Sequence, residues 1–216
     1  GPWPRTSRSW PGSPAGGLDF REVLDRRHMV RAFRPDPIDP VVLDRLLSDT
    51  LRAPSAGNSQ GTDLVVLNGP VETARYWDVA LPAERRATFA WPDLLAAPVL
   101  VLVLADSRRY LDRYAEPDKV ATGLGDDPSA WRTPYWLVDG GMAVHTLLLG
   151  AVDAGLGALL FGLFAREEAV RAALGVPEDR DVVGVVALGH PRPSRPGRSA
   201  ARPRRSEDDV IHRGGW

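Results

Sequence analysis

Two short polar segments contain the residues whose types and spacing could bind a charged ligand. The first covers residues 27–33 (RHMVRAF), and the second covers residues 53–60 (APSAGNSQ). Arginine binds phosphate through charge-assisted, often bidentate hydrogen bonds, so Arg27 and Arg31 form a candidate anion site. Two solvated surface arginines are the alternative interpretation of the same spacing.

The second segment is built from small residues and short polar side chains. Small residues let a backbone approach a ligand closely, while Ser55 and Asn58 supply hydrogen bonds near the chain. An ordinary helix-to-strand turn has the same composition, so this interpretation also stays open.

Helices are predicted before each polar segment. Leu18, Val23 and Leu24 recur at helical spacing, and if the helical turn continues through the first segment, Arg27 and Arg31 share one face. A second helix is expected to begin with Asp39 as its N-cap and to end at Pro54, since an interior proline breaks the helical hydrogen bonding.

Further apolar runs predict strands at 63–67, 99–104, 158–161 and 182–188 and helices at 71–79 and 135–153. The last helix is apolar almost all round and is expected to be buried. His145 on that helix is therefore interpreted as a hydrogen-bonded core or interface residue. Asp139 is interpreted as a satisfied buried carboxylate or as a charge complementing the helix dipole.

The composition is that of one soluble globular domain. The chain has 216 residues, 44% hydrophobic and 25% charged, with a net charge of −1 that favours no particular partner. It has no cysteine, which excludes thiol catalysis, disulfides and cysteine metal sites. It has no pair of histidines at zinc-helix spacing, so we do not expect a zinc helix. We expect a flexible arm over 1–17, a single domain over 18–216, a cytoplasmic location and no membrane partner.

Taken together, the two polar segments resemble the paired N-terminal signature of the FMN-dependent nitroreductase family. The resemblance continues through 139–143 (DGGMA), 154–158 (AGLGA) and 204–212 (RRSEDDVIH), and covers residues 19–216 in order. It implies an α+β fold with a central, mostly antiparallel sheet flanked by helices. It also implies a homodimer with swapped terminal segments, bound FMN, and NAD(P)H as reductant.

The resemblance also assigns cofactor contacts by position. Leu160, Phe161 and Gly162 are placed beside the isoalloxazine ring, where the Gly162 N–H could donate to flavin N5 or O4. Arg202 and Arg204 are placed at the phosphate, opposite the first segment. The full set is Arg27, His28, Met29, Arg31, Pro54, Ser55, Ala56, Asn58, Leu160, Phe161, Gly162, Arg202 and Arg204. No side chain is expected to act as a catalytic acid or base.

Two other interpretations compete for parts of the sequence. The glycines of 155–162 could suggest a dinucleotide or phosphate loop, but they lead into a strand instead of following one, and no Lys-Ser or Lys-Thr comes after them. The arginine-rich stretch 192–205 could bind nucleic acid, but acids return at 207–209 and the rest of the chain is not basic. We therefore predict no nucleic-acid partner.

The function predicted from this resemblance is hydride transfer from NAD(P)H to FMN and then to a nitroaromatic, quinone or similar acceptor by a ping-pong mechanism. Two alternatives stay open. One is a specialised flavoenzyme of the same fold, such as a biosynthetic dehydrogenase, a flavin-fragmenting oxygenase or a deazaflavin user. The other is a non-catalytic module that binds nucleic acid or a partner through the arginine-rich tail.

The chain departs from the family pattern in places. Met29 stands where the family often has a hydroxyl residue, and residues 61–63 (GTD) replace a frequent Pro-Trp. Residues 108–136 are expected to form a lid that sets substrate specificity. The group that serves flavin N1 and O2 is unassigned, with Arg108, Arg109 and Arg113 as candidates by position alone.

Overall fold

The computed structural model describes residues 18–163, 166–194 and 201–216, so the predicted arm over 1–17 lies outside the described residues. A four-stranded sheet runs in the order β1-β2-β4-β3, and its neighbouring strands are antiparallel. The strands are β1 (Thr62–Asn68), β2 (Val99–Ala105), β3 (Gly157–Phe161) and β4 (Asp181–Gly189). All the predicted strands are thereby confirmed.

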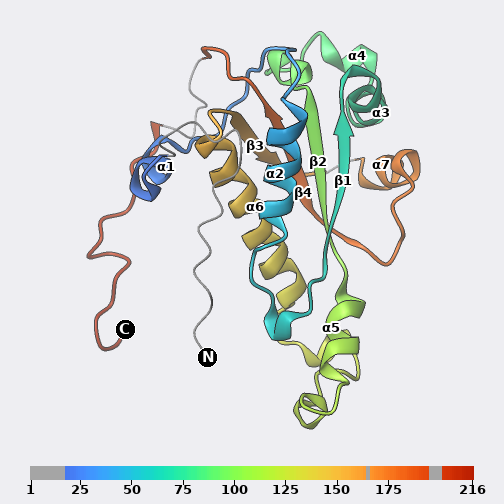
Figure 1. Ribbon diagram of the computed structural model, residues 1–216, viewed down its shortest axis with the longest axis vertical. Helices are drawn as coiled ribbons and strands as arrows, with labels where there is room; N and C mark the ends of the chain where they lie inside the picture. Colours follow the sequence, from blue (N-terminus) through green and yellow to red (C-terminus); the bar gives the residue numbers. More distant parts are fainter. Residues whose placement is uncertain (1–17, 164–165, 195–200) are drawn as a thin grey trace.

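Helices cover both faces of this sheet (Figure 1). On one face lie α2 (Pro40–Thr50) and α6 (Tyr135–Asp153), which pack against each other. On the other face lie α3 (Pro70–Ala80) and α7 (Glu167–Leu174). The remaining helices are α1 (Phe20–Arg26), α4 (Ala83–Arg86) and α5 (Ser107–Tyr114). This arrangement confirms the predicted α+β architecture.

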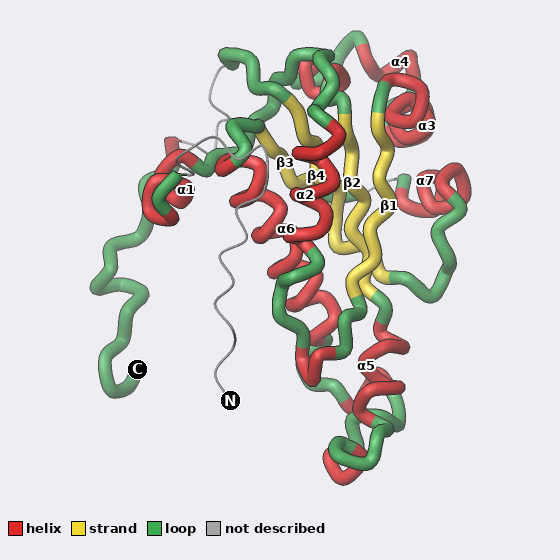
Figure 2. Tube along the Cα trace, in the orientation of Figure 1, coloured by secondary structure: helices red, strands yellow, loops and turns green. Residues whose placement is uncertain are grey.

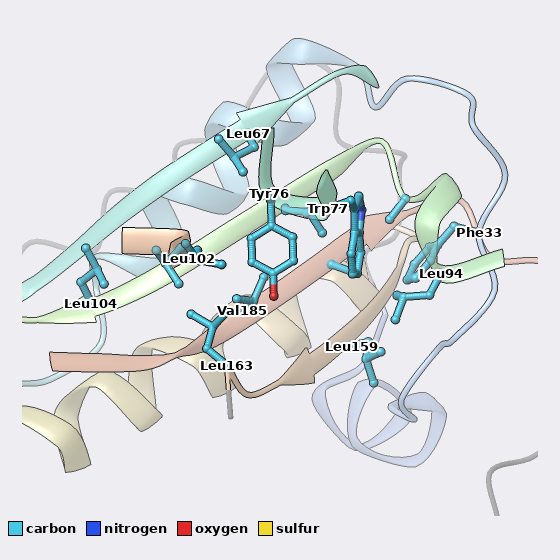
Figure 3. Packing of buried hydrophobic residues seen from close by; sticks show 14 of the residues in the cluster. Phe33, Leu67, Tyr76, Trp77, Leu94, Leu102, Leu104, Leu159, Leu163 and Val185 are labelled. Atoms are coloured by element: carbon cyan, nitrogen blue, oxygen red, sulfur yellow. The ribbon is translucent and has the colours of Figure 1, made fainter. Parts of the chain in front are cut away.

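Strand β2 shows why the sheet needs cover on both faces, because every one of its residues is buried. Leu100, Leu102 and Leu104 point into the cluster under α3, while Val99, Val101 and Val103 point into the cluster under α2 and α6. This alternation follows from the two-residue period of a strand. Figure 3 shows the first cluster, in which the rings of Tyr76 and Trp77 lie over the sheet among Leu102 and Val185.

Local signals place the helix ends. The Asp39 side chain accepts a hydrogen bond from the Val41 N–H at 2.8 Å, and Pro40 occupies the first turn, so the predicted start of α2 is confirmed. Helix α6 spans the residues predicted for it. By length and composition it could cross a membrane, and 44% of its most apolar window is buried inside this fold.

The structure corrects two expectations about helices. Helix α1 ends at Arg26, and the chain is extended from Arg27, so Arg27 and Arg31 do not share a helical face. Helix α6 is buried on one face only, because Leu137 and Val138 are about two-fifths exposed. His145 is exposed in the single chain and is not a core residue.

The C-terminal residues 201–216 are exposed and form neither a strand nor a named helix. Figure 2 draws this segment as a loop that extends away from the sheet. Val210 and Ile211 are each 48% exposed, and Trp216 is fully exposed. The tail therefore contributes no packing to the core of its own chain.

Candidate functional site

The first polar segment lies along the edge strand β3. The Val30 N–H donates to the Ala158 carbonyl at 2.9 Å, and Met29 forms a parallel bridge with Ala158. The structure therefore brings residues 27–31 next to the strand that ends at Phe161 and continues into Gly162. These two predicted groups, far apart in sequence, form one region. His28 is exposed there, with its ring Nδ1 2.9 Å from the Arg26 carbonyl oxygen.

Among the described residues, no carboxylate forms an ion pair with Arg27 or Arg31. Both arginines are half-buried. The segments outside the description, 1–17, 164–165 and 195–200, contain no Asp or Glu. The other half-buried arginines do have carboxylate partners: Arg45, Arg86, Arg113, Arg171 and Arg180. A partly desolvated cation without a counter-charge favours binding of an anion at this place.

An aromatic cavity of about 300 Å³ opens beside Arg31. Phe161 and Gly162 line it from the end of β3, and Arg31 lines it from the first polar segment. The remaining lining is apolar and mostly aromatic: Tyr76, Trp77, Ala80, Leu81, Phe89, Trp91, Leu94 and Leu159. A mostly apolar pocket with few polar groups is typical of sites for planar organic ligands.

Ring contacts fix the walls of this cavity. Phe161 stacks on Trp77 with ring centroids 5.9 Å apart and an angle of 7° between the planes. The Arg31 guanidinium lies over the Trp91 ring at 5.3 Å, and it also donates to the Met29 carbonyl at 3.2 Å. These contacts hold the cation at the cavity wall, since a guanidinium is attracted to the face of an indole ring.

Sequence reasoning missed the residues of this cavity that come from α3 and from the segment after α4. Tyr76, Trp77, Phe89 and Trp91 line the cavity, although none was predicted as a site residue. The available signal was the concentration of four large aromatic residues between 76 and 91. That signal does not by itself tell a cavity wall from a core.

The second polar segment forms a tight turn just before β1. Gly57, Asn58 and Gln60 all have positive φ, at 61°, 59° and 53°. The Gln60 N–H donates to Ser55 Oγ at 3.0 Å, so Ser55 is used inside the loop. Positive φ at non-glycine residues is sparsely populated and is concentrated at functional loops.

The predicted lid packs directly on this loop. Arg113 of α5 donates from Nε to the Gly57 carbonyl at 2.8 Å and also pairs with Asp118. Arg113 is thereby engaged within the chain, whereas Arg108 and Arg109 are exposed. A second cavity of about 450 Å³ adjoins Ala56 and is lined by Tyr114, Leu124, Ala130, Trp131, Arg132, Thr133 and Tyr135.

Within one chain, the two polar segments are not brought together. Residues 27–31 lie outside β3, at one edge of the sheet, and the loop leads into β1, at the opposite edge. In Figure 1, α1 lies at the left of the sheet and the loop before β1 lies at the lower end of α6. Arg202 and Arg204 are in the exposed tail. The predicted site residues therefore form separate groups.

A sequence profile of the nitroreductase family matches residues 24–190. The chain belongs to the nitroreductase family. The family predicted from the motifs is thereby confirmed, and some of the relatives that the chain resembles are named as NADH dehydrogenases or NAD(P)H nitroreductases.

Two relatives show how the family members differ. A 5,6-dimethylbenzimidazole synthase of Rhodobacter capsulatus is 30% identical over 202 residues, which cover 90% of this chain and 89% of the relative. An NADH dehydrogenase of Thermus thermophilus is also 30% identical over 192 residues, which cover 81% of this chain and 87% of the relative.

The fold agrees with solved structures of the family. A protein described as a nitroreductase from Exiguobacterium sibiricum, solved in complex with FMN, aligns with a TM-score of 0.70 at 18% identity. The alignment covers 90% of this chain and 97% of that one. The FMN in that structure agrees with the cofactor predicted for this nitroreductase-family chain.

Proposed function

We propose that this chain is a cytoplasmic, FMN-dependent oxidoreductase. It takes hydride from NAD(P)H and passes it to a nitroaromatic, a quinone or another electron-poor acceptor by a ping-pong mechanism. The observation that carries this proposal is the half-buried Arg31 at the wall of the aromatic cavity that ends at Gly162. Arg27, four positions earlier in the same segment, is also half-buried, and neither arginine makes an ion pair with a described residue. This donor set fits a flat ring joined to a phosphate.

The protein's own residues then have separate tasks. Arg27 and Arg31 hold the phosphate through charge-assisted hydrogen bonds. Phe161, Trp77 and Trp91 exclude water from the cavity, and the Gly162 N–H stabilises negative charge that develops on the ring. FMN, when bound, supplies the redox chemistry, so no side chain needs to act as an acid or base.

We further propose that the site is completed in a homodimer. The loop at 54–58 lies at the opposite edge of the sheet from Arg27, so within one chain it does not join the first group. In a second copy it would cover the cofactor, and the exposed tail would bring Arg202 and Arg204 to the phosphate. The exposed apolar residues of α6 offer a surface for this association.

Stopped-flow spectroscopy tests the proposal directly. Protein loaded with FMN is mixed anaerobically with NADH or NADPH, and bleaching of the flavin absorbance is followed. Reduction by either nicotinamide, with parallel double-reciprocal plots for a quinone acceptor, is the expected result. Protein that binds no FMN, or FMN-loaded protein that neither nicotinamide reduces, contradicts it.

A second candidate follows from the Rhodobacter relative, which is as similar to this chain as the NADH dehydrogenase. In that case the chain is a flavin-fragmenting enzyme that forms 5,6-dimethylbenzimidazole. Supplying reduced FMN and oxygen, and searching for this product by mass spectrometry, distinguishes the two. Product formation without turnover of quinones or nitroarenes favours this candidate.

A further inference from the structure

Asp139 connects α6 to two other elements through a single oxygen atom. Its Oδ2 accepts a hydrogen bond from the Ala56 N–H at 2.8 Å and another from the Tyr110 hydroxyl at 2.7 Å. Ala56 belongs to the 54–60 loop, and Tyr110 belongs to α5 at the base of the predicted lid. We infer that Asp139 is a positioning residue that holds the loop and the lid together in the shape that binds the cofactor.

The carboxylate is buried without a cation beside it. Asp139 is 2% exposed, and it makes no ion pair with any described residue. A buried charge is tolerated only where hydrogen bonds satisfy it, so the Ala56 and Tyr110 donors are its stabilising partners. Removing the carboxylate leaves the buried tyrosine hydroxyl and the loop N–H without an acceptor.

The loop needs an external restraint because its backbone is strained. Asn58 and Gln60 hold positive φ, which persists at non-glycine residues only where the surroundings over-determine the conformation. The restraints come from α6 through Asp139, from α5 through Arg113, and from the loop itself through Ser55. Asp139 is the restraint that joins both other elements to the sheet-covering helix.

The chain around the loop packs closely against α5, at the base of the predicted lid. A Cβ added at Gly57 would lie 2.9 Å from Tyr114, and one added at Gly61 would lie 2.5 Å from Tyr110. Tyr110 itself is fully buried. A tyrosine hydroxyl is protonated at neutral pH, so Tyr110 is a donor to Asp139 there. Burial, and then the hydrogen bond to Asp139, raise its pKa well above the ordinary value, so it stays a donor at higher pH as well.

Hydrogen exchange with mass spectrometry on the full chain, without any cofactor, tests whether Asp139 restrains the loop. Asp139→Ala is expected to speed exchange in peptides covering 53–61 by about tenfold or more, since the Ala56 N–H loses its acceptor. Asp139→Asn, which keeps one acceptor oxygen, should restore much of the protection. Peptides from β2 should not change. Unchanged exchange at 53–61 in Asp139→Ala overturns the inference.

The functional consequence rests on the proposed function and has its own readout. FMN titration is expected to show affinity weaker by about tenfold in Asp139→Ala and partly recovered in Asp139→Asn, while the rate of flavin reduction at saturating FMN stays within about twofold. Thr146→Val is the control, because it removes a hydrogen bond from the same helix at the Met142 carbonyl, away from the loop.

Tyr110→Phe keeps the inference testable if Asp139→Ala does not fold. This variant keeps the ring and removes only the hydroxyl donor, so exchange should rise in the peptide covering α5 and FMN affinity should fall. If the loop exchanges faster but FMN affinity is unchanged in all variants, the claim that this restraint supports FMN binding is overturned. Wild-type protein that binds no FMN would contradict the proposed function. The exchange results would still show whether Asp139 restrains the loop and α5.

Discussion

At the scale of single residues, chemical type alone does not distinguish a ligand-binding arginine from a surface arginine. The carboxylate partners of each arginine in the structure do distinguish them. Arg113 and Arg180 look as available in the sequence as Arg27 and Arg31, yet each is held by carboxylates. Arg27 and Arg31 combine partial burial with the absence of an acidic partner among the described residues. This combination is the basis on which we propose them as the anion-binding pair.

Arg27→Ala and Arg31→Ala are each expected to weaken FMN binding by about tenfold to a hundredfold. A charge-assisted hydrogen bond is worth roughly 1.5–3 kcal/mol, and about 1.4 kcal/mol corresponds to a factor of ten. Quenching of flavin fluorescence on titration measures the change. Arg21→Ala, an exposed arginine on α1, is the control and should bind FMN as the wild type does. If both site variants bind FMN as tightly as the wild type, Arg27 and Arg31 do not hold the phosphate.

Tyr110 and Tyr76 make the fold sensitive to alkaline pH. Burial raises the pKa of both hydroxyls, and for Tyr110 the hydrogen bond to Asp139 adds to the effect. Above the ordinary tyrosine pKa of about 10, the unfolded chain loses these protons while the folded chain keeps them. The free energy of unfolding should therefore be unaffected by these groups below pH 10 and should fall above it.

Urea denaturation between about pH 8 and 11 measures this fall. Tyr110→Phe removes one of the two groups, so its free energy of unfolding should decline less steeply above about pH 10 than that of the wild type. Tyr76 is expected to contribute to the slope that remains. An identical slope in the variant would show that Tyr110 titrates normally in the folded protein.

At the scale of elements, the sequence predicted what depends on local periodicity. The strands, the start of α2 and the length of α6 follow from apolar spacing and caps, and the structure confirms them. The helical face that Arg27 and Arg31 would share if the helix continued does not form, because Met29 instead pairs with Ala158, 129 positions along the chain. The cavity wall at Tyr76 and Trp91 was missed for the same reason: contacts between distant segments create it.

The contact between α6 and β4 gives an element-scale prediction. A Cβ at Gly140 would lie 2.6 Å from a methyl of Val183, whose β-branched side chain has little freedom to move. Gly140→Ala is therefore expected to lower the free energy of unfolding by about 1–3 kcal/mol. At Gly150 the added atom meets only the end of the flexible Leu46 side chain, at 2.9 Å. Gly150→Ala should be much milder, and equal losses in denaturant unfolding would contradict this account.

At the scale of the whole molecule, the separation of the site groups argues for assembly. The loop at 54–58 and the arginines at 27 and 31 lie at opposite edges of one sheet, and the tail with Arg202 and Arg204 contributes nothing to its own core. Helix α6 meanwhile exposes Tyr135, Leu137 and Val138. A second copy that covers this face would bury the apolar residues and could complete the site in the same step.

Leu137→Glu tests this assembly. A carboxylate in an apolar interface is costly to desolvate, so the variant is expected to be monomeric, with a mass near 23.5 kDa by light scattering, whereas the wild type should show twice that mass. FMN affinity should fall together with dimerisation, because in the proposed dimer each site takes residues from both chains. Val71→Glu is the control: Val71 is 80% exposed on α3, on the other side of the sheet, and the variant should stay dimeric. A wild-type monomer that holds FMN tightly, or a monomeric Leu137→Glu with undiminished FMN affinity, would show that one chain builds the site alone.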